Sequence, residues 1–206
     1  MAVFPLAQWV RLLQDLSRQG DSILTDVSLR ALTGLEAEAL RKAVWRLTQK
    51  GLLVRLGPCL YGNSQRMPTL EALACLLGRP AYISRESALS EVGILSQMPL
   101  TLTCVTTGKT REVRTPLGNI AFSHLQIPLF WGYTNRQGIL WAEPEKALLD
   151  WVYLTRKAGG DLPPLDELEW EALDSRKLKE YGARFPKSIK AEIARWLPQP
   201  TTLEDP

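Results

Sequence analysis

The chain has 206 residues, of which 45% are hydrophobic and 23% charged, and its formal net charge is +3. This composition excludes an intrinsically disordered protein, because enough apolar residues are present to form a buried core. No apolar run approaches the roughly 20 residues that a transmembrane helix needs. The N-terminus also lacks the basic start and continuous apolar block of a signal peptide, so we expect a cytoplasmic protein.

Three amphipathic helices are predicted in the first third of the chain, over residues 5–17, 27–32 and 36–50. A tight turn at Gly34 separates the second helix from the third, and two helices joined in this way form a helix-turn-helix motif. Two short apolar stretches follow the third helix and flank the turn of a β-hairpin, at residues 52–56 and 59–62. Residues 1–66 are therefore predicted to form a winged-helix DNA-binding domain.

The third predicted helix carries a basic face opposite its apolar stripe. Lysine and arginine neutralise phosphates, and arginine also reads guanine edges. Glu36 and Glu38 suit the start of the helix but would repel phosphates, so we expect base reading to begin at Arg41. The residues predicted to bind DNA are Arg30, Arg41, Lys42, Trp45, Arg46, Gln49, Lys50 and Arg55.

The residues leave one alternative open for this domain. A winged helix that contacts only other proteins would carry the same basic face in solvent. The predicted wing has one basic residue, Arg55, so strong DNA binding would depend on a second copy of the chain or on a second basic patch.

Residues 67–206 are predicted to form an α+β domain in which a small antiparallel sheet packs with helices. The polar stretch 63–68 is a linker candidate. Helices are predicted over residues 69–77, 85–95, 144–155, 165–173, 175–181 and 186–196. Strands are predicted over residues 101–107, 111–115, 118–125, 128–134 and 138–142.

Two groups of basic residues in this domain form a candidate second surface for DNA or a protein partner. The first group borders a hairpin, and the second follows two short helices near the C-terminus. Charged edge strands and solvated helix faces explain the same pattern without a partner. The members are Lys109, Arg111, Arg114, Arg176, Lys177, Lys179, Arg184, Lys187 and Lys190.

The stretch "WAEPEKALLDWVYL" (141–154) is the one dense cluster of acids and bases in an apolar context. Pro144 suits the first helical position, and Glu143 and Glu145 suit the positive end of the helix dipole. Lys146 and Asp150 are four residues apart and are expected to pair on the surface. We therefore predict a capped structural helix here and no catalytic residues.

Motifs of catalysis and metal binding are absent from the sequence. It contains no glycine-rich phosphate loop, no G-x-S-x-G and no H-E-x-x-H. The three cysteines, Cys59, Cys75 and Cys104, are widely spaced, and the only histidine, His124, has no partner at ligand spacing. We accordingly expect no metal ion, no cofactor and no enzymatic activity.

Several segments in fixed order carry a resemblance to a known family: "YISRESALSEVGILSQMP" (82–99), "VTTGKTREVRTPLGNIAFSHL" (105–125), "LFWGY" (129–133) and "AEPEKALLDWVY" (142–153). Together with "RLTQKGLLVRL" in the winged helix and "ARFPKSIKAEIARWL" near the end, they resemble the AbiEi-type antitoxins. These proteins belong to type IV toxin–antitoxin systems of abortive infection.

The resemblance implies two activities. The winged helix would bind double-stranded operator DNA and repress its own operon, as a homodimer or two cooperating copies on inverted repeats. The C-terminal domain would neutralise a nucleotidyltransferase toxin from the neighbouring gene, with or without a stable complex. The wing departs from the family, because "RLGPCLYG" holds fewer basic residues than such wings usually carry.

Two other functions remain open at this stage. The chain would also suit a winged-helix transcriptional regulator whose C-terminal domain binds a ligand or a protein partner. An enzyme that modifies the toxin would need a phosphate-binding loop or metal-binding carboxylates, and the sequence offers neither. A toxin gene beside this one would separate the antitoxin from the ordinary regulator.

Overall fold

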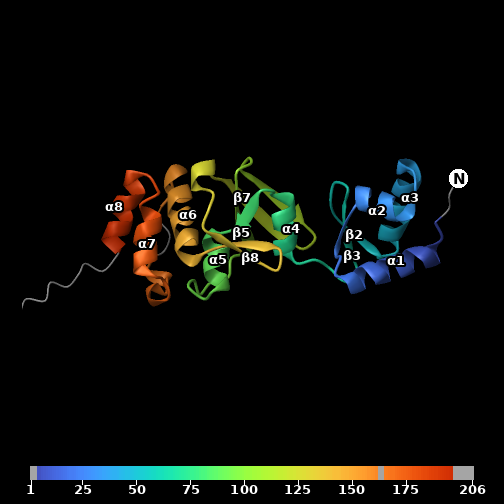
Figure 1. Cartoon of the computed structure of the whole chain (residues 1–206), viewed down its shortest axis with the longest axis horizontal. Coiled ribbons are helices and arrows are strands. Elements are labelled where there is room, and N and C mark those ends of the chain that lie inside the picture. The colour runs from blue at the N-terminus through green and yellow to red at the C-terminus, as the bar shows by residue number, and fades with distance from the viewer. Residues whose placement is uncertain (1–3, 162–164, 197–206) are drawn as a thin grey trace, which may run out of the picture. The chain divides into compact units, whose positions relative to one another are not determined.

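The computed structural model describes residues 4–161 and 165–196, and the chain divides into two compact units (Figure 1). The N-terminal unit contains the chain up to Leu73 together with Arg114–Gly118, and the C-terminal unit contains Ala74–Val113 and the chain from Asn119 on. The fold is α+β, as predicted. None of the described helices combines the length and apolar character that a membrane crossing requires.

The N-terminal unit contains the three predicted helices and the predicted hairpin. Its elements are α1 (Leu6–Gln19), β1 (Ile23–Thr25), α2 (Asp26–Thr33), α3 (Ala37–Gln49), β2 (Leu53–Gly57) and β3 (Leu60–Asn63). Strand β1 was not predicted from the sequence. It pairs antiparallel with β3 and completes a three-stranded sheet in the order β1-β3-β2.

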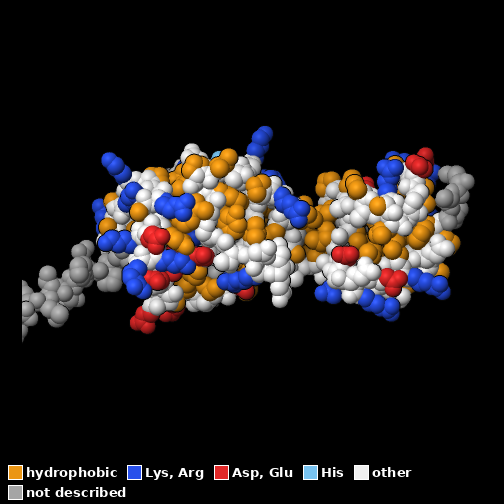
Figure 2. Space-filling model, viewed as in Figure 1, with side chains coloured by type: hydrophobic (Ala, Val, Ile, Leu, Met, Phe, Trp, Pro, Cys, Tyr) orange, Lys and Arg blue, Asp and Glu red, His pale blue; other side chains and the backbone are white. Residues whose placement is uncertain are grey.

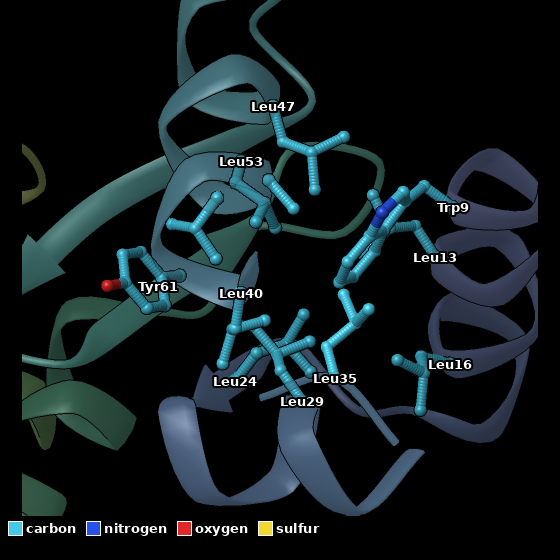
Figure 3. Packing of buried hydrophobic residues seen from close by; sticks show 12 residues of the cluster. Trp9, Leu13, Leu16, Leu24, Leu29, Leu35, Leu40, Leu47, Leu53 and Tyr61 are labelled. Atoms are coloured by element: carbon cyan, nitrogen blue, oxygen red, sulfur yellow. The ribbon is translucent and has the colours of Figure 1, made fainter. Parts of the chain in front are cut away.

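A compact apolar core holds these elements together. Figure 3 shows Trp9, Leu13 and Leu16 of α1 pointing towards leucines of α2, α3 and the hairpin. Burial of one such side chain contributes roughly 1.5–3 kcal/mol relative to exposure. One face of α3 therefore packs against this core, and the opposite face is exposed to solvent.

Local chemistry sets where α2 begins and ends. Thr25 is the N-cap, and its side chain accepts a hydrogen bond from the Ser28 amide at 3.0 Å while Ser28 Oγ accepts one from the Thr25 amide. This reciprocal capping box satisfies two amides at the start of the helix. Gly34 ends α2 with φ +65°, a left-handed conformation that glycine adopts without strain. The turn between α2 and α3 is thereby defined.

The C-terminal unit is built on a six-stranded sheet in the order β6-β7-β5-β4-β9-β8. Its strands are β4 (Ala81–Ile83), β5 (Thr101–Thr106), β6 (Arg111–Thr115), β7 (Gly118–His124), β8 (Tyr133–Arg136) and β9 (Ile139–Ala142). The sheet is mixed and not antiparallel throughout as predicted: β4–β5 and β8–β9 are antiparallel, whereas β5 pairs parallel with β7 and β4 pairs parallel with β9. A strand pattern identifies its own residues but not the distant strand that pairs with it.

The remaining helices are, in chain order, α4 (Leu70–Leu77), α5 (Arg85–Glu91), α6 (Pro144–Lys157), α7 (Ser175–Gly182) and α8 (Lys187–Trp196). Helix α4 spans the division between the units. In the C-terminal unit, α6 lies between α5 on one side and α7 and α8 on the other (Figure 1). This central position decides the environment of the charged residues on α6.

The segment predicted as a helix over residues 165–173 forms two short 3-10 turns instead, Leu165–Glu167 and Trp170–Ala172. Between the two turns, the Glu169 amide donates a hydrogen bond to the Ile94 carbonyl at 2.9 Å, and Leu168 forms an isolated antiparallel β-bridge with Leu95. A backbone committed to a distant segment in this way cannot continue the i to i−4 bonds of a helix. The predicted strand over residues 128–134 is likewise replaced by a 3-10 turn, Ile127–Leu129, and the later strand β8.

The predicted surface pair of Lys146 and Asp150 is fully buried, so that prediction was wrong. The two side chains form an ion pair, and Asp150 Oδ2 also accepts hydrogen bonds from Tyr82 OH at 2.8 Å and Ser84 Oγ at 2.9 Å. Lys146 Nζ donates a further bond to Tyr82 OH at 2.8 Å. Ser84 precedes α5 but binds Asp150 in place of capping that helix. We call these four residues the buried ion cluster.

Aromatic rings complete the surroundings of the buried ion cluster. Lys146 Nζ lies 5.2 Å from the ring centroid of Trp131 and 5.4 Å from those of Tyr82 and Phe185. Burial raises the pKa of Asp150 and lowers the pKa of Lys146, each opposed by the attraction of the partner. Because α6 packs against other elements on both sides, this pair has no route to solvent.

Candidate nucleic-acid interface

The exposed face of α3 gathers the predicted DNA-binding residues of the helix. Positions 41, 42, 45, 46 and 49 recur at intervals of one and four, so their side chains share one side of the helix. All of them are exposed, as is Lys50 at the end of the helix, whereas Leu40, Ala43, Val44 and Leu47 are buried on the other side. The fold thus presents one continuous polar and basic surface.

A shallow groove of about 580 Å³ runs along this face, with Arg41, Lys42, Trp45 and Arg46 in its lining. Trp45 is 62% exposed, which is unusual for so large an apolar side chain. Figure 2 shows Lys and Arg side chains over α3 and along α1 on the visible face of the N-terminal unit. A helix face that only contacts solvent has no need of an exposed indole among three cations, so this arrangement favours a binding surface.

Acidic side chains compensate some of these cations. Lys42 pairs with Glu38 at 2.8 Å, and Arg30 on α2 approaches Glu36 at 3.9 Å. Arg41 and Arg46 form no ion pair with the residues that the structure describes. Arg41 and Arg46 are therefore the cations of this face that no acidic side chain of the described chain compensates.

The wing contributes little positive charge. Arg55 on β2 is exposed and is the one basic residue of the hairpin. The tip of the hairpin contacts α2, because the Asp26 amide donates a hydrogen bond to the Cys59 carbonyl at 3.3 Å. A hydrogen bond to Asp26 and the charge of that carboxylate raise the pKa of the Cys59 thiol. The charge of Asp26 on α2 thus acts at the tip of the wing together with that of Arg55, and sequence analysis did not identify Asp26 as part of this surface.

The predicted second basic surface separates into two groups, one at β6, where Arg114 falls in the N-terminal unit, and one on α7, α8 and their connection. Lys109, Arg111 and Arg114 lie along β6 and the loop before it, and all three are exposed. Arg111 is partly committed within the chain, because its guanidinium lies 4.8 Å from the Phe122 ring and donates to the Leu77 carbonyl at 2.7 Å. The hairpin group therefore acts partly as structural support for the sheet edge.

The second group lies on α7, α8 and their connection, on the far side of α6 from the sheet (Figure 1). Two of its members hold α7 against the unit: Lys177 pairs with Glu143 at 2.6 Å, and the Arg184 guanidinium lies 3.7 Å from the Trp131 ring centroid. The exposed remainder is Arg176, Lys179, Lys187 and Lys190. Acidic side chains are interspersed with the basic ones over these helices (Figure 2), so no single field of one sign is formed.

Glu143 should make the docking of α7 sensitive to acid. Burial raises its pKa, but hydrogen bonds from Lys177 and Tyr181 outweigh that effect and lower the pKa below the ordinary value of 4.5. A lowered folded-state pKa stabilises the fold above pH 4.5, and this contribution is lost as the pH falls through the folded-state value. We therefore expect Glu143→Gln to be less stable than the wild type at neutral pH, with a difference that shrinks below about pH 4.5.

Chemical denaturation at a series of pH values measures this difference. Glu180→Gln removes an exposed acid from α7, the helix that Glu143 holds in place, and serves as the matched control. A difference between Glu143→Gln and the wild type that stays constant from neutral pH to pH 3 would contradict the proposed linkage.

No group of three or more His, Cys, Asp or Glu side chains within residues 4–161 and 165–196 is arranged to hold a metal ion. Sequence analysis missed Asp26, and in the buried ion cluster it missed Tyr82, Ser84 and the burial of the Lys146–Asp150 pair. One signal for this burial was present in the sequence: Leu149 is an apolar residue on the side of α6 that was assigned to solvent.

Comparisons with known proteins establish the fold alone. No family model matches the chain, and no curated protein matches it. Among solved structures, the chain is similar to the crystal structure of the RV2827C protein from Mycobacterium tuberculosis, with a TM-score of 0.56 and 15% sequence identity. That match covers 96% of this chain and 74% of the other, so nearly the whole chain shares its arrangement of elements with a natural protein.

Proposed function

We propose that this chain is a winged-helix DNA-binding regulator that serves as the antitoxin of a type IV toxin–antitoxin system. The observation that supports DNA binding is the exposed face of α3, where Arg41, Trp45 and Arg46 surround a groove on the second helix of a helix-turn-helix. The antitoxin role rests on the resemblance of the ordered segments between residues 82 and 153 to the AbiEi-type antitoxins.

In the proposed complex, α3 enters the major groove and α2 lies across the backbone. Arg41 and Arg46, which have no acidic partner in the described chain, supply bidentate donors for guanine O6 and N7 or for phosphate. The Trp45 indole supplies apolar contact for a thymine methyl group at the centre of the face. Arg55 adds one phosphate contact from the wing, so a second copy of the chain on an inverted repeat would supply the remaining affinity.

A gel-shift titration with duplex DNA from upstream of the chain's own gene tests the first half of this proposal. Saturable binding that survives an excess of unrelated duplex supports it. If the operator and the unrelated duplex compete equally well, the chain binds DNA only through non-specific attraction to phosphates.

Co-expression with the neighbouring open reading frame tests the second half. We expect growth arrest when that frame is expressed alone and recovery of growth when this chain is expressed with it. The Arg41→Ala/Lys42→Ala variant should still restore growth from a separate promoter, because α3 belongs to the unit assigned to DNA. A neighbouring gene that causes no arrest would favour the ordinary ligand-binding or protein-binding regulator.

A further inference from the structure

A second cavity, of about 490 Å³, lies within the C-terminal unit, where the end of β7, the loop before β6, the start of α5 and the end of α6 meet. Its size falls in the range of pockets that hold small molecules. The polar side chains in its lining are Arg85, Thr110, Ser123, His124, Thr155 and Lys157. We call this cavity the donor pocket, and it is separate from the α3 face.

Arg85 is fixed in position at the donor pocket. Its backbone has φ +59°, a left-handed conformation that is uncommon for a residue other than glycine and concentrates at functional sites. The guanidinium donates to Ser123 Oγ at 3.1 Å and to Glu86 Oε1 at 3.0 Å. A guanidinium has five N–H donors. Nε–H is buried without an acceptor, and the Nη groups, which each make one of these bonds, have no further acceptor among the described residues and keep hydrogen-bonding capacity for a ligand.

Two hydroxyl groups of the donor pocket are available as donors. Ser123 Oγ accepts from Arg85, and Thr110 Oγ1 accepts from the His124 amide at 2.9 Å. Each hydroxyl therefore retains its hydrogen for another acceptor. His124 Nδ1 lies 2.8 Å from the Gly108 carbonyl, and because a carbonyl can only accept, this nitrogen carries the proton. The hydrogen bond holds the loop before β6 against the end of β7.

Electrostatics at the donor pocket favour an anion. Lys157 is exposed and forms no ion pair with the residues that the structure describes. The carbonyls of Leu154 and Thr155 at the end of α6 accept hydrogen bonds from the Ala158 and Gly160 amides, which reduces the negative charge facing the cavity. Glu86 offsets part of the charge of Arg85, and Lys157 and the free donors remain.

We propose that the donor pocket binds a small molecule through a phosphate or carboxylate group. Arg85, Ser123 and Thr110 would donate hydrogen bonds to its oxygens, and Lys157 would supply the balancing charge. This inference goes beyond the proposed function, because the pocket shares no residue with the DNA-binding face and the sequence resemblance assigns it no role.

The single histidine of the chain provides a direct test, since its imidazole proton signals report on this pocket alone. The full-length protein is titrated with inorganic phosphate, and separately with succinate, at constant pH and ionic strength set with chloride. We expect saturable shifts of the His124 signals with at least one of the two anions, and the stronger binder identifies the preferred oxyanion.

Lys157→Ala should require roughly tenfold more anion for the same shift, since it removes one charged donor. Lys187→Ala removes an exposed lysine from α8 and should titrate like the wild type. Shifts that do not saturate with either anion, or an equal loss in both variants, would overturn the proposal. The Arg41→Ala/Lys42→Ala variant should retain anion binding, so failure of the DNA-binding proposal is distinguished from failure of this one.

Discussion

Replacement of Arg41 and Lys42 by alanine should weaken binding to operator DNA by roughly a hundredfold or more, because each well-formed contact to a base edge contributes about 1–3 kcal/mol. Most of the loss should come from Arg41, since Lys42 is already compensated by Glu38 at 2.8 Å. Both side chains are exposed and away from the core, so the fold should be unchanged. The single variants rank the two contributions.

Gel shifts at several salt concentrations separate phosphate contact from base reading. Loss of a phosphate contact lowers the salt slope by about one, whereas loss of a base contact lowers discrimination between operator and unrelated DNA. Arg41→Lys keeps the charge but removes the planar fork, so it should reduce discrimination more than affinity for unrelated DNA.

A double replacement of Lys187 and Lys190 by alanine provides the control, because it removes the same charge from exposed positions on α8. This control should leave operator binding within about threefold of the wild type, and unchanged binding by the Arg41→Ala/Lys42→Ala variant would refute the assignment of α3. A large loss of operator binding in the control variant would instead assign the DNA contact to the basic group on α7 and α8.

The buried ion cluster should produce the largest effect on stability. Lys146→Met leaves Asp150 buried with only Tyr82 and Ser84 as donors, and Asp150→Asn leaves the Lys146 ammonium without a counter-charge. Breaking one side of a buried pair costs about 3–5 kcal/mol, because the remaining charge has lost both water and its partner. Each single variant should therefore unfold at clearly lower denaturant concentration.

The double variant Lys146→Met/Asp150→Leu should recover much of this loss, since it leaves no uncompensated charge among the rings of Trp131 and Phe185. Denaturant unfolding followed by circular dichroism measures all three variants, and separate transitions for the two units are fitted individually. Lys187→Met is the control at an exposed position and should lie within about 0.5 kcal/mol of the wild type. Single variants within 1 kcal/mol of the wild type would show that the pair is dispensable.

Sequence patterns predicted the N-terminal unit well because its structure is dominated by local signals. Helical periodicity, the glycine turn at Gly34 and the short hairpin each depend on residues close in sequence. The exposed face of α3 followed from the same periodicity, so the candidate DNA-binding residues were identified before their geometry. Strand β1 was missed because three residues are too few to show alternation, and its pairing with β3 is a long-range contact.

Long-range contacts decided most of what differed in the C-terminal unit. The parallel pairing of β4 with β9 joins segments far apart in the chain, and no local pattern encodes it. The 3-10 turns near Leu168 replace a predicted helix because the backbone there bonds to residues 94 and 95. The donor pocket likewise combines four separate elements, so its residues show no motif in the sequence.

Helix α6 shows the boundary between these two kinds of information. The sequence alone determined that residues 144–155 are helical, that Pro144 starts the helix and that Lys146 and Asp150 share one side of it. Only the tertiary structure decided that this side is buried, because α5, α7 and α8 pack against the helix. Tyr82 on β4 and Ser84 directly after it, both far away in the sequence, bind Asp150. Helical spacing specifies which residues face together, but the free energy of that face depends on whether it meets water or protein.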